Sequence, residues 1–156
     1  MLRPMLVLLC SLLPLTSQAA SLKTHELEQL LAQVARASSQ GTPRAINEDI
    51  LDQGFQAEGR TLINYLSVRA EHARQMQANP DAVRRQLQAS VCANPGFVRL
   101  LRQGAQLRYE FSEYRSNRPV IREQFNAADC PKSGTVSVRF LLHQGLRLLF
   151  LLQLTE

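Results

Sequence analysis

The chain has 156 residues, of which 45% are hydrophobic and 20% charged, and its formal net charge is +5. A chain of this length can bury the core of one domain and is too short for two comfortable ones. The charge excess lies mostly outside the middle of the chain, since residues 20–130 carry 14 basic and 12 acidic side chains, a net charge of +2. A domain so nearly neutral attracts a phosphate backbone weakly, so we predict that it has no nucleic-acid partner.

The first residues follow the order of a secretory signal. A single arginine precedes an apolar run, Met5–Leu15, which is followed by small residues. The run is shorter than the roughly 20 apolar residues that a membrane-spanning helix needs. Ser17 and Ala19 suit the −3 and −1 positions of a cleavage site. We therefore predict that residues 1–19 are a signal peptide, cleaved after Ala19, and that the protein is periplasmic or secreted.

Cleavage of that segment would remove one cysteine and leave two, Cys92 and Cys130. An even number of cysteines in an oxidising compartment predicts a disulfide. Closing a loop of about 38 residues stabilises a fold by about 4 kcal/mol in the chain-entropy model. The alternatives have less support, because a zinc site needs more ligands and a catalytic thiolate needs a neighbouring base. We predict that the Cys92–Cys130 disulfide is structural.

The next elements are a helix and a β-hairpin. Leucines at helical spacing predict a helix that begins at Thr24, as its N-cap, and ends at Ser38-Ser39. A segment from about Ile46 to Ala57 and the run TLINYLSV, residues 61–68, are separated by a Glu58-Gly59-Arg60 turn. Their apolar, β-branched and aromatic residues favour strands, so the two segments predict a hairpin.

The middle of the chain is predicted to be helical, and a second hairpin follows. Asn79-Pro80 and Asn94-Pro95 each place a capping residue before a proline, which is a typical helix start. The segment LRYEFS, residues 107–112, alternates apolar and polar residues, as in a strand with one buried face. A turn leads to a second strand, residues 120–125.

This order predicts a single α+β domain over residues 20–130. We expect a four-stranded antiparallel sheet made of the two hairpins, with helices packed on one face and one disulfide. That disulfide would attach the helical layer to the end of the last strand.

Four stretches carry a resemblance to a known family: TPRAINEDIL, EGRTLINYLSV, SVCANPGFVRLLRQGAQLRYEF and AADC. From about Leu22 to Cys130 the chain resembles a family of small exported pseudomonad proteins called quorum-sensing-regulated virulence factors. The resemblance implies export, an α+β domain with one disulfide, and a link to cell-density-controlled virulence. It implies no catalytic residues.

Motifs for catalysis or cofactor binding are absent from the sequence, which has no G-x-S-x-G, P-loop or G-x-G-x-x-G pattern. The histidines, His25, His72 and His143, are scattered and lack metal-ligand spacing. Glu110 and Glu113 would lie on opposite faces of a strand, so they cannot act as a paired acid and base. We therefore predict no catalytic, cofactor-binding or metal-binding residues and no cofactor.

Two groups of side chains could form a binding surface. Tyr65, Tyr109 and Tyr114 could stack on a ligand, although aromatic residues of hairpins more often pack in the core or at its rim. Five arginines could form a basic face, and an ordinary solvated helix surface is the favoured alternative: Arg84, Arg85, Arg99, Arg102 and Arg108.

The C-terminal segment, residues 131–156, differs in composition from the rest. Leucine dominates its second half, with Arg139, His143 and Arg147 at intervals of four. A helix of this pattern would be amphipathic and would contact a membrane surface or a partner through residues 136–154. The two alternatives are a strand that packs onto the sheet and an extension that arose from a change of reading frame.

Two functions are compatible with the sequence. The first is an exported, non-enzymatic interaction module, linked to quorum-sensing-regulated virulence, that engages an unknown envelope or host protein through a sheet face or a helix groove. The alternative is a small periplasmic or secreted enzyme whose site is assembled from scattered residues. The lack of a nucleophile with a neighbouring base favours the first. The sequence carries no signal for an oligomeric state.

Overall fold

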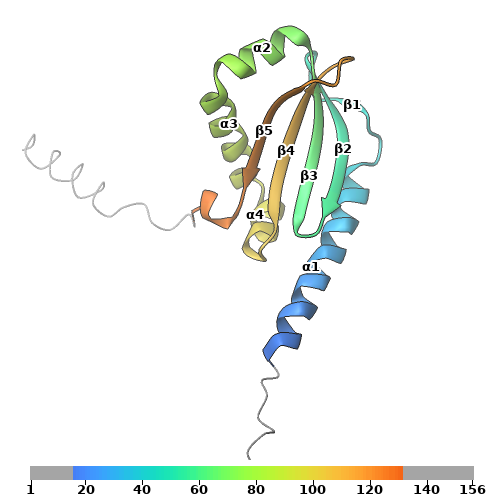
Figure 1. Cartoon of the computed structure of the whole chain (residues 1–156), viewed down its shortest axis with the longest axis vertical. Helices are drawn as coiled ribbons and strands as arrows, with labels where there is room; N and C mark the ends of the chain where they lie inside the picture. Colours follow the sequence, from blue (N-terminus) through green and yellow to red (C-terminus); the bar gives the residue numbers. More distant parts are fainter. Residues whose placement is uncertain (1–15, 132–156) are drawn as a thin grey trace, which may run out of the picture.

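The computed structural model describes residues 16–131, and their side chains from residue 21 onward. Within this part of the chain no helix is both long and apolar enough to cross a membrane. Helices and one sheet form two layers (Figure 1). In chain order the elements are α1 (Thr16–Ser38), β1 (Arg44–Ala45), β2 (Ile50–Glu58), β3 (Thr61–Val68), α2 (Ala70–Ala78), α3 (Pro80–Ala93), α4 (Pro95–Arg102), β4 (Gln106–Glu113), β5 (Pro119–Phe125) and the 3-10 helix η1 (Ala127–Asp129).

Both predicted hairpins are confirmed. Strands β2 and β3 pair antiparallel, and so do β4 and β5. The helix starts also follow the sequence signals, since α3 and α4 begin at prolines. At α4 the Asn94 side chain caps the helix by accepting from the N–H groups of Gly96 and Phe97, at 2.9 and 3.2 Å. At α3 the Asn79 side chain makes no such bond.

The predicted four-stranded antiparallel sheet is wrong in two respects. The sheet has five strands in the order β1-β2-β3-β4-β5, and β3 and β4 pair parallel. The parallel pair arises because α2, α3 and α4 carry the chain from the end of β3 back to the edge of the sheet where β3 begins (Figure 1). A crossover of this kind joins parallel strands, whereas a tight turn joins antiparallel ones. Turn signals fix pairing within each hairpin and not between the two hairpins.

The additional strand, β1, results from a turn within the segment predicted as one strand. The Asn47 side-chain oxygen accepts from the N–H groups of Asp49 and Ile50, both at 2.9 Å. This Asx turn reverses the chain. Arg44 and Ala45 then pair antiparallel with β2. Arg44 also donates to the buried Asp52 carboxylate at 2.8 Å, so the short strand is held by an ion pair as well.

Helix α1 begins at Thr16, eight residues before the predicted start at Thr24, so that prediction is wrong. The helix continues across the predicted cleavage bond after Ala19. Residues 21–26 are exposed, and the first buried side chain is that of Leu27. The helix therefore starts to contribute to the core close to the point where the sequence places its beginning.

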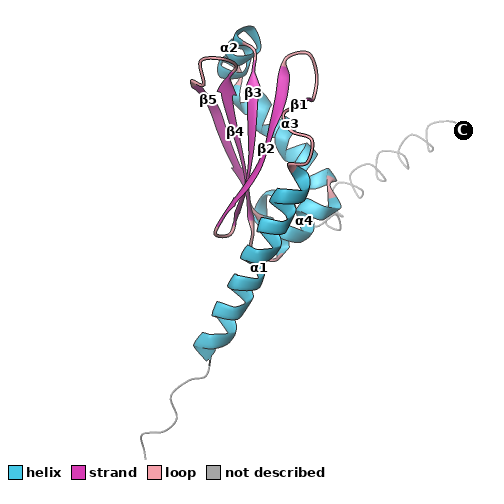
Figure 2. Cartoon of the chain, turned by 90° about the vertical axis from the view of Figure 1, so that its right-hand side faces the viewer, coloured by secondary structure: helices cyan, strands magenta, loops and turns pink. Residues whose placement is uncertain are grey.

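The helices lie on one side of the sheet, as predicted (Figure 2). The sheet residues facing them include Leu62, Leu66 and Val68 of β3. These residues are an even number of positions apart, so their side chains point to the same face of the sheet. They belong to two neighbouring groups of buried side chains, one under α1 and α4 and the other under α2. The opposite side of the sheet is covered by no helix within residues 16–131, and we call it the open face.

Candidate functional site

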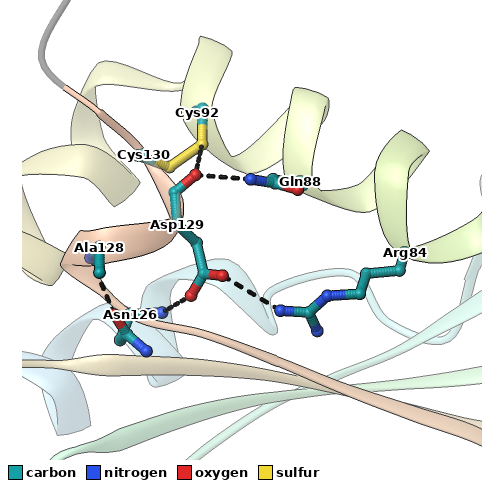
Figure 3. The surroundings of a disulfide bond; sticks show 7 residues. All are labelled: Arg84, Gln88, Cys92, Asn126, Ala128, Asp129 and Cys130. Carbon is teal, nitrogen blue, oxygen red and sulfur yellow. Dashed lines mark hydrogen bonds and ion pairs between the residues drawn. A yellow bond between two sulfur atoms is a disulfide. The ribbon is translucent and has the colours of Figure 1, made fainter. Parts of the chain in front are cut away.

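The predicted site residues, Cys92 and Cys130, are joined in the structure by a disulfide with a Cα–Cα distance of 5.3 Å. The bond connects the last turn of α3 with the chain that follows η1 (Figure 3). The Cys92 sulfur lies 3.5 Å from the Asp129 carbonyl oxygen, which also accepts from the Gln88 amide at 2.7 Å. Cys130 is buried in the core. The residues around the bond therefore fix η1 against α3.

Arg84, about two turns before Cys92 on α3, strengthens the same contact. Its guanidinium lies 3.1 Å from the Asp129 carboxylate and 2.6 Å from that of Glu123, and 5.0 Å from the centre of the Phe125 ring. The hydrogen bond to Glu123 is the main reason that the pKa of Arg84 is raised. Together with the disulfide, these contacts attach the helical layer to the end of β5. We call them the α3 attachment (Arg84, Gln88, Cys92, Glu123, Asp129 and Cys130).

The lower half of the open face, towards the β2–β3 turn, is filled by paired charges. Arg108 lies 2.9 Å from both Glu58 and Glu110, and Arg122 lies 3.1 Å from Glu110. Beneath them Ile63 is completely buried although no helix covers it within the described chain. Its direct neighbours across the strands include Arg108, whose long stem can cover apolar surface while its charge stays in water.

The upper half of the open face carries two hollows, and three of the four side chains that cross its strands are small. Cross-strand register places Ala45, Leu51, Ser67 and Ser112 side by side on β1, β2, β3 and β4. Directly opposed residues of a sheet share one face, so the four side chains form a row across the strands. The row lies between larger residues, and two hollows meet at its Ser67–Ser112 pair.

The first of these, the rim hollow, has a volume of about 670 Å³ and lies where β2 starts and where β3 and β4 end. Its lining combines apolar, aromatic and charged residues: Ala45, Asn47, Glu48, Asp49, Leu51, Ser67, Arg69, Ala70, Tyr114 and Arg115.

The second, the hairpin hollow, has a volume of about 430 Å³ and lies over β4, β5 and their turn. Its lining includes Tyr65, Glu110, Ser112, Asn117 and Arg122. The two hollows together present both charges, hydroxyl groups and two tyrosines to solvent, which is the mixture found at protein-binding surfaces.

The shifted pKa values of Tyr65, Tyr109 and Glu113 do not suit these three groups to proton transfer at neutral pH. Burial, followed by the charges of Glu110 and Glu58, raises the pKa of Tyr65, and burial raises the pKa of Tyr109 to about 12. Both phenols therefore stay protonated and can only donate or accept hydrogen bonds. Hydrogen bonds from Arg118 and Ser116 lower the pKa of Glu113, which stays ionised. A general acid or base works best with a pKa near the operating pH.

The remaining predicted residues fall in separate places. His25 is exposed on α1, and His72 on α2 lies 3.9 Å from Asp49. No three metal-ligating side chains meet in the described residues. Residues 132–156, with His143 and the proposed membrane-contacting segment, lie outside the described part of the chain.

The tyrosines and arginines also separate between the two sides of the sheet. Tyr65 and Tyr114 line the hollows, whereas Tyr109 packs edge-on against Phe125 in the core, with ring centres 6.1 Å apart. Arg108 lies on the open face, while the other four arginines lie on α3 and α4. The five arginines therefore do not form one basic face.

A comparison with known families covers nearly all of this domain. A model of the family described as "Putative quorum-sensing-regulated virulence factor" matches residues 20–131. The chain belongs to this family. A crystal structure of a "putative secreted protein" from Pseudomonas aeruginosa is 59% identical, covers 70% of this chain and 96% of its own, and superposes with a TM-score of 0.68. None of the curated proteins compared matches this member of the family.

Two more distant structures share the fold. The pilotin of the type 2 secretion system of Vibrio vulnificus is 14% identical, covers 72% of this chain and 99% of its own, and has a TM-score of 0.58. The type II secretion system pilotin AspS of Vibrio cholerae is 18% identical, with the same coverage of 72% and 99% and a TM-score of 0.55. At these identities the likeness shows a common fold.

Sequence reasoning found Tyr65 and Tyr114 but missed the residues that make the surface hollow. Ser67 and Ser112 become neighbours only through the parallel pairing of β3 and β4, and no local pattern indicates that pairing. Arg115 could have been noticed in the turn that follows the alternating strand pattern of β4, because binding residues concentrate in such loops.

Proposed function

We propose that this member of the virulence-factor family is an exported, non-enzymatic interaction module that binds a segment of an envelope protein partner on the open face of its sheet. The observation that carries the proposal is the hollow upper half of this face. A surface with two hollows, the exposed Tyr114, the half-buried Tyr65 and charged rims is built on the strands, and no helix of the described chain covers it. The other face is occupied by the protein's own helices.

The contrast between hollow and filled halves supports a specific binding surface over a general solvent-facing one. In the lower half, charged side chains neutralise one another and cover Ile63. In the upper half, Tyr114 keeps 48% of its surface exposed and lines the rim hollow with Ser67. Exposed aromatic residues beside a depression are the side chains that contribute most to protein interfaces.

The comparisons support export and a protein partner. The relative from Pseudomonas aeruginosa is described as a secreted protein, and two proteins of the same fold are pilotins of secretion systems. For this chain we propose that residues 1–19 form the signal peptide and are removed after Ala19. Mass spectrometry of the exported protein should then find Ala20 at its amino terminus, and a mature protein that still begins at Met1 would contradict cleavage.

The three shifted groups of the sheet suit binding better than proton transfer. The phenols of Tyr65 and Tyr109 have raised pKa values, and the pKa of Glu113 is lowered, so each of these groups keeps one protonation state near neutral pH. Binding through fixed donors, acceptors and charges needs no titrating group.

Site-specific photo-cross-linking in the producing cells tests the proposal. A photoreactive phenylalanine analogue replaces Tyr65, which lines the hairpin hollow, or Gln86, which is exposed on α3. We expect adducts with an envelope protein from position 65 and none from position 86, at equal amounts of exported protein. Adducts from position 86 alone, or from neither position, would contradict binding on the open face.

A further inference from the structure

The rim hollow carries charges of both signs on different segments of the chain. Glu48 and Asp49 lie in the turn between β1 and β2. Arg69 lies between β3 and α2, and Arg115 lies in the turn between β4 and β5. No ion pair among the described residues joins either carboxylate to either guanidinium. Two acidic and two basic side chains therefore line one hollow of about 670 Å³ without pairing with one another.

These charges also find few partners elsewhere in the protein. The Asp49 carboxylate lies 3.9 Å from the His72 ring on α2, which neutralises it only when the ring is protonated. Glu48 has no basic partner within the described chain, and Arg69 and Arg115 have no carboxylate partner there. The hollow therefore offers carboxylate acceptors for a cation and guanidinium donors for an anion.

Backbone hydrogen bonds connect the segments that carry these charges. The N–H of Arg69 donates to the Asp49 carbonyl oxygen at 3.0 Å, and the N–H of Tyr114 donates to the Val68 carbonyl oxygen at 2.7 Å. The Arg115 guanidinium lies 5.7 Å from the centre of the Tyr114 ring, which is a cation–π distance. Both signs of charge are thus presented on a connected backbone, so a partner need not order these segments when it binds.

We propose that the rim hollow binds a segment of the partner's chain that carries a basic and an acidic side chain close together. The basic side chain would lie beside the carboxylates of the β1–β2 turn and the acidic one beside the two arginines. This proposal rests on the proposed function, because it specifies the chemistry of the partner on the same face.

Charge complementarity selects an occupant with both signs of charge. A purely acidic segment would meet two carboxylates, and a purely basic one would meet two guanidiniums, whereas a mixed segment can place each of its charges beside the opposite one. An apolar side chain between the two charges can contact the apolar part of the lining, which includes Ala45, Leu51 and Ala70.

Short peptides that differ only in charge test the proposal on the exported protein. The mixed peptide Ac-Ala-Lys-Leu-Glu-Ala-NH2 is measured in this order and with its two charged residues exchanged, and the tighter order is used. Its counterparts carry Glu-Leu-Glu, Lys-Leu-Lys or Gln-Leu-Gln at the same positions. Each peptide is titrated to about 1 mM while amide chemical shifts are followed by NMR.

We expect the mixed peptide to bind at least about tenfold more tightly than each counterpart, because only it satisfies both signs of charge. Its largest shifts should fall on amides of the hollow: Ser67, Arg69, Tyr114 and Arg115. Equal or tighter binding of a peptide with a single sign of charge, shifts elsewhere on the protein, or no shifts would overturn the proposal.

Variants of the two kinds of charge should change this preference in opposite directions. Glu48→Gln should reduce the preference for the mixed peptide over Glu-Leu-Glu severalfold, and Arg115→Gly should reduce its preference over Lys-Leu-Lys severalfold. The φ of Arg115 is +73°, which glycine adopts readily, so Arg115→Gly should not lower Tm. Glu26→Gln and Arg85→Gln, exposed on α1 and α3, are the matched controls and should leave both ratios unchanged. Wild-type ratios in Glu48→Gln and Arg115→Gly would contradict the proposal.

The outcomes also distinguish this inference from the function on which it rests. Cross-links from position 65 that survive Glu48→Gln and Arg115→Gly at wild-type yield would retain the open face as the binding surface and reject the mixed-charge occupant. Binding of the mixed peptide in the rim hollow without any cross-link from position 65 would retain the charge preference and reject the envelope partner.

Discussion

The two sides of the sheet differ in how completely their polar groups are bonded within the protein. On the helical side the residues of the α3 attachment bond to one another, as Gln88 does to the Asp129 carbonyl oxygen, and Cys92 and Cys130 form a covalent bond. On the open face Arg69 and Arg115 have no carboxylate partner among the described residues, and hollows of about 670 and 430 Å³ are open to solvent. Groups whose bonding capacity is met internally stabilise a fold, whereas unpaired groups on a rigid surface are available to a partner.

Stability and recognition therefore depend on different layers of the molecule. The disulfide and Arg84 contact residues at the end of β5 and are distant in the register from Ser67 and Ser112. Substitutions on the helical side should therefore change the free energy of unfolding, and substitutions in the upper half of the open face should change binding with little effect on that free energy.

We expect loss of the disulfide to destabilise the protein most. Replacing either Cys92 or Cys130 with serine should lower the free energy of unfolding by about 2–5 kcal/mol, because the loop of 38 residues is no longer closed in the unfolded chain. Urea denaturation of the exported protein measures the change. Two thiols that react with an alkylating reagent in the folded, unreduced protein would show that the bond is not formed.

Alkaline pH should destabilise the core through Tyr109. Its pKa is about 12 in the folded protein and about 10 when unfolded, so both states hold the phenol proton below pH 10. As the pH rises from 10 to 12 the unfolded state loses this proton first, and the free energy of unfolding should fall by about 2–3 kcal/mol. Tyr109→Phe removes the titrating group. If urea titrations show the same decline in both proteins, the fall does not come from Tyr109.

A smaller effect is expected from the arginine of the α3 attachment. Arg84→Ala should lower the free energy of unfolding by about 1–2 kcal/mol, because it removes one cation–π contact and two ion pairs that are partly open to solvent. Arg85→Ala changes the next residue, which is exposed on the same helix, and should stay within about 0.5 kcal/mol of the wild type. Equal losses in the two variants would contradict a specific role for Arg84.

The same contrast separates what the sequence predicts from what it does not. Local signals fix the hairpins and the proline-started helices, and counting cysteines after signal removal gives the Cys92–Cys130 pair. The parallel pairing of β3 and β4 depends on how three helices return the chain, and no local pattern specifies that path. The row through Ser67 and Ser112 depends on this pairing, so the fold class was predictable and the hollow surface was not.

The charges of the surface divide in the same way. Arg108 and Arg84 were both recognised as members of a basic set, but the sheet places them on opposite sides, each beside carboxylates. The sequence does not distinguish Arg69 and Arg115 from other arginines, because the fold decides whether an arginine has a carboxylate partner. Pairing partners far apart along the chain, such as Glu123 for Arg84, are set by tertiary structure.

We expect the partner to bind the open face, and the helical layer to stabilise the fold without contacting the partner. Ser112→Tyr places a large side chain at the junction of the two hollows, on a strand that accepts aromatic residues. Its Tm should stay within about 3 °C of the wild type, while the yield of the complex captured by a photoreactive residue at the neighbouring position 65 falls at least about tenfold. A complex captured at wild-type yield from a protein with unchanged Tm would contradict this expectation.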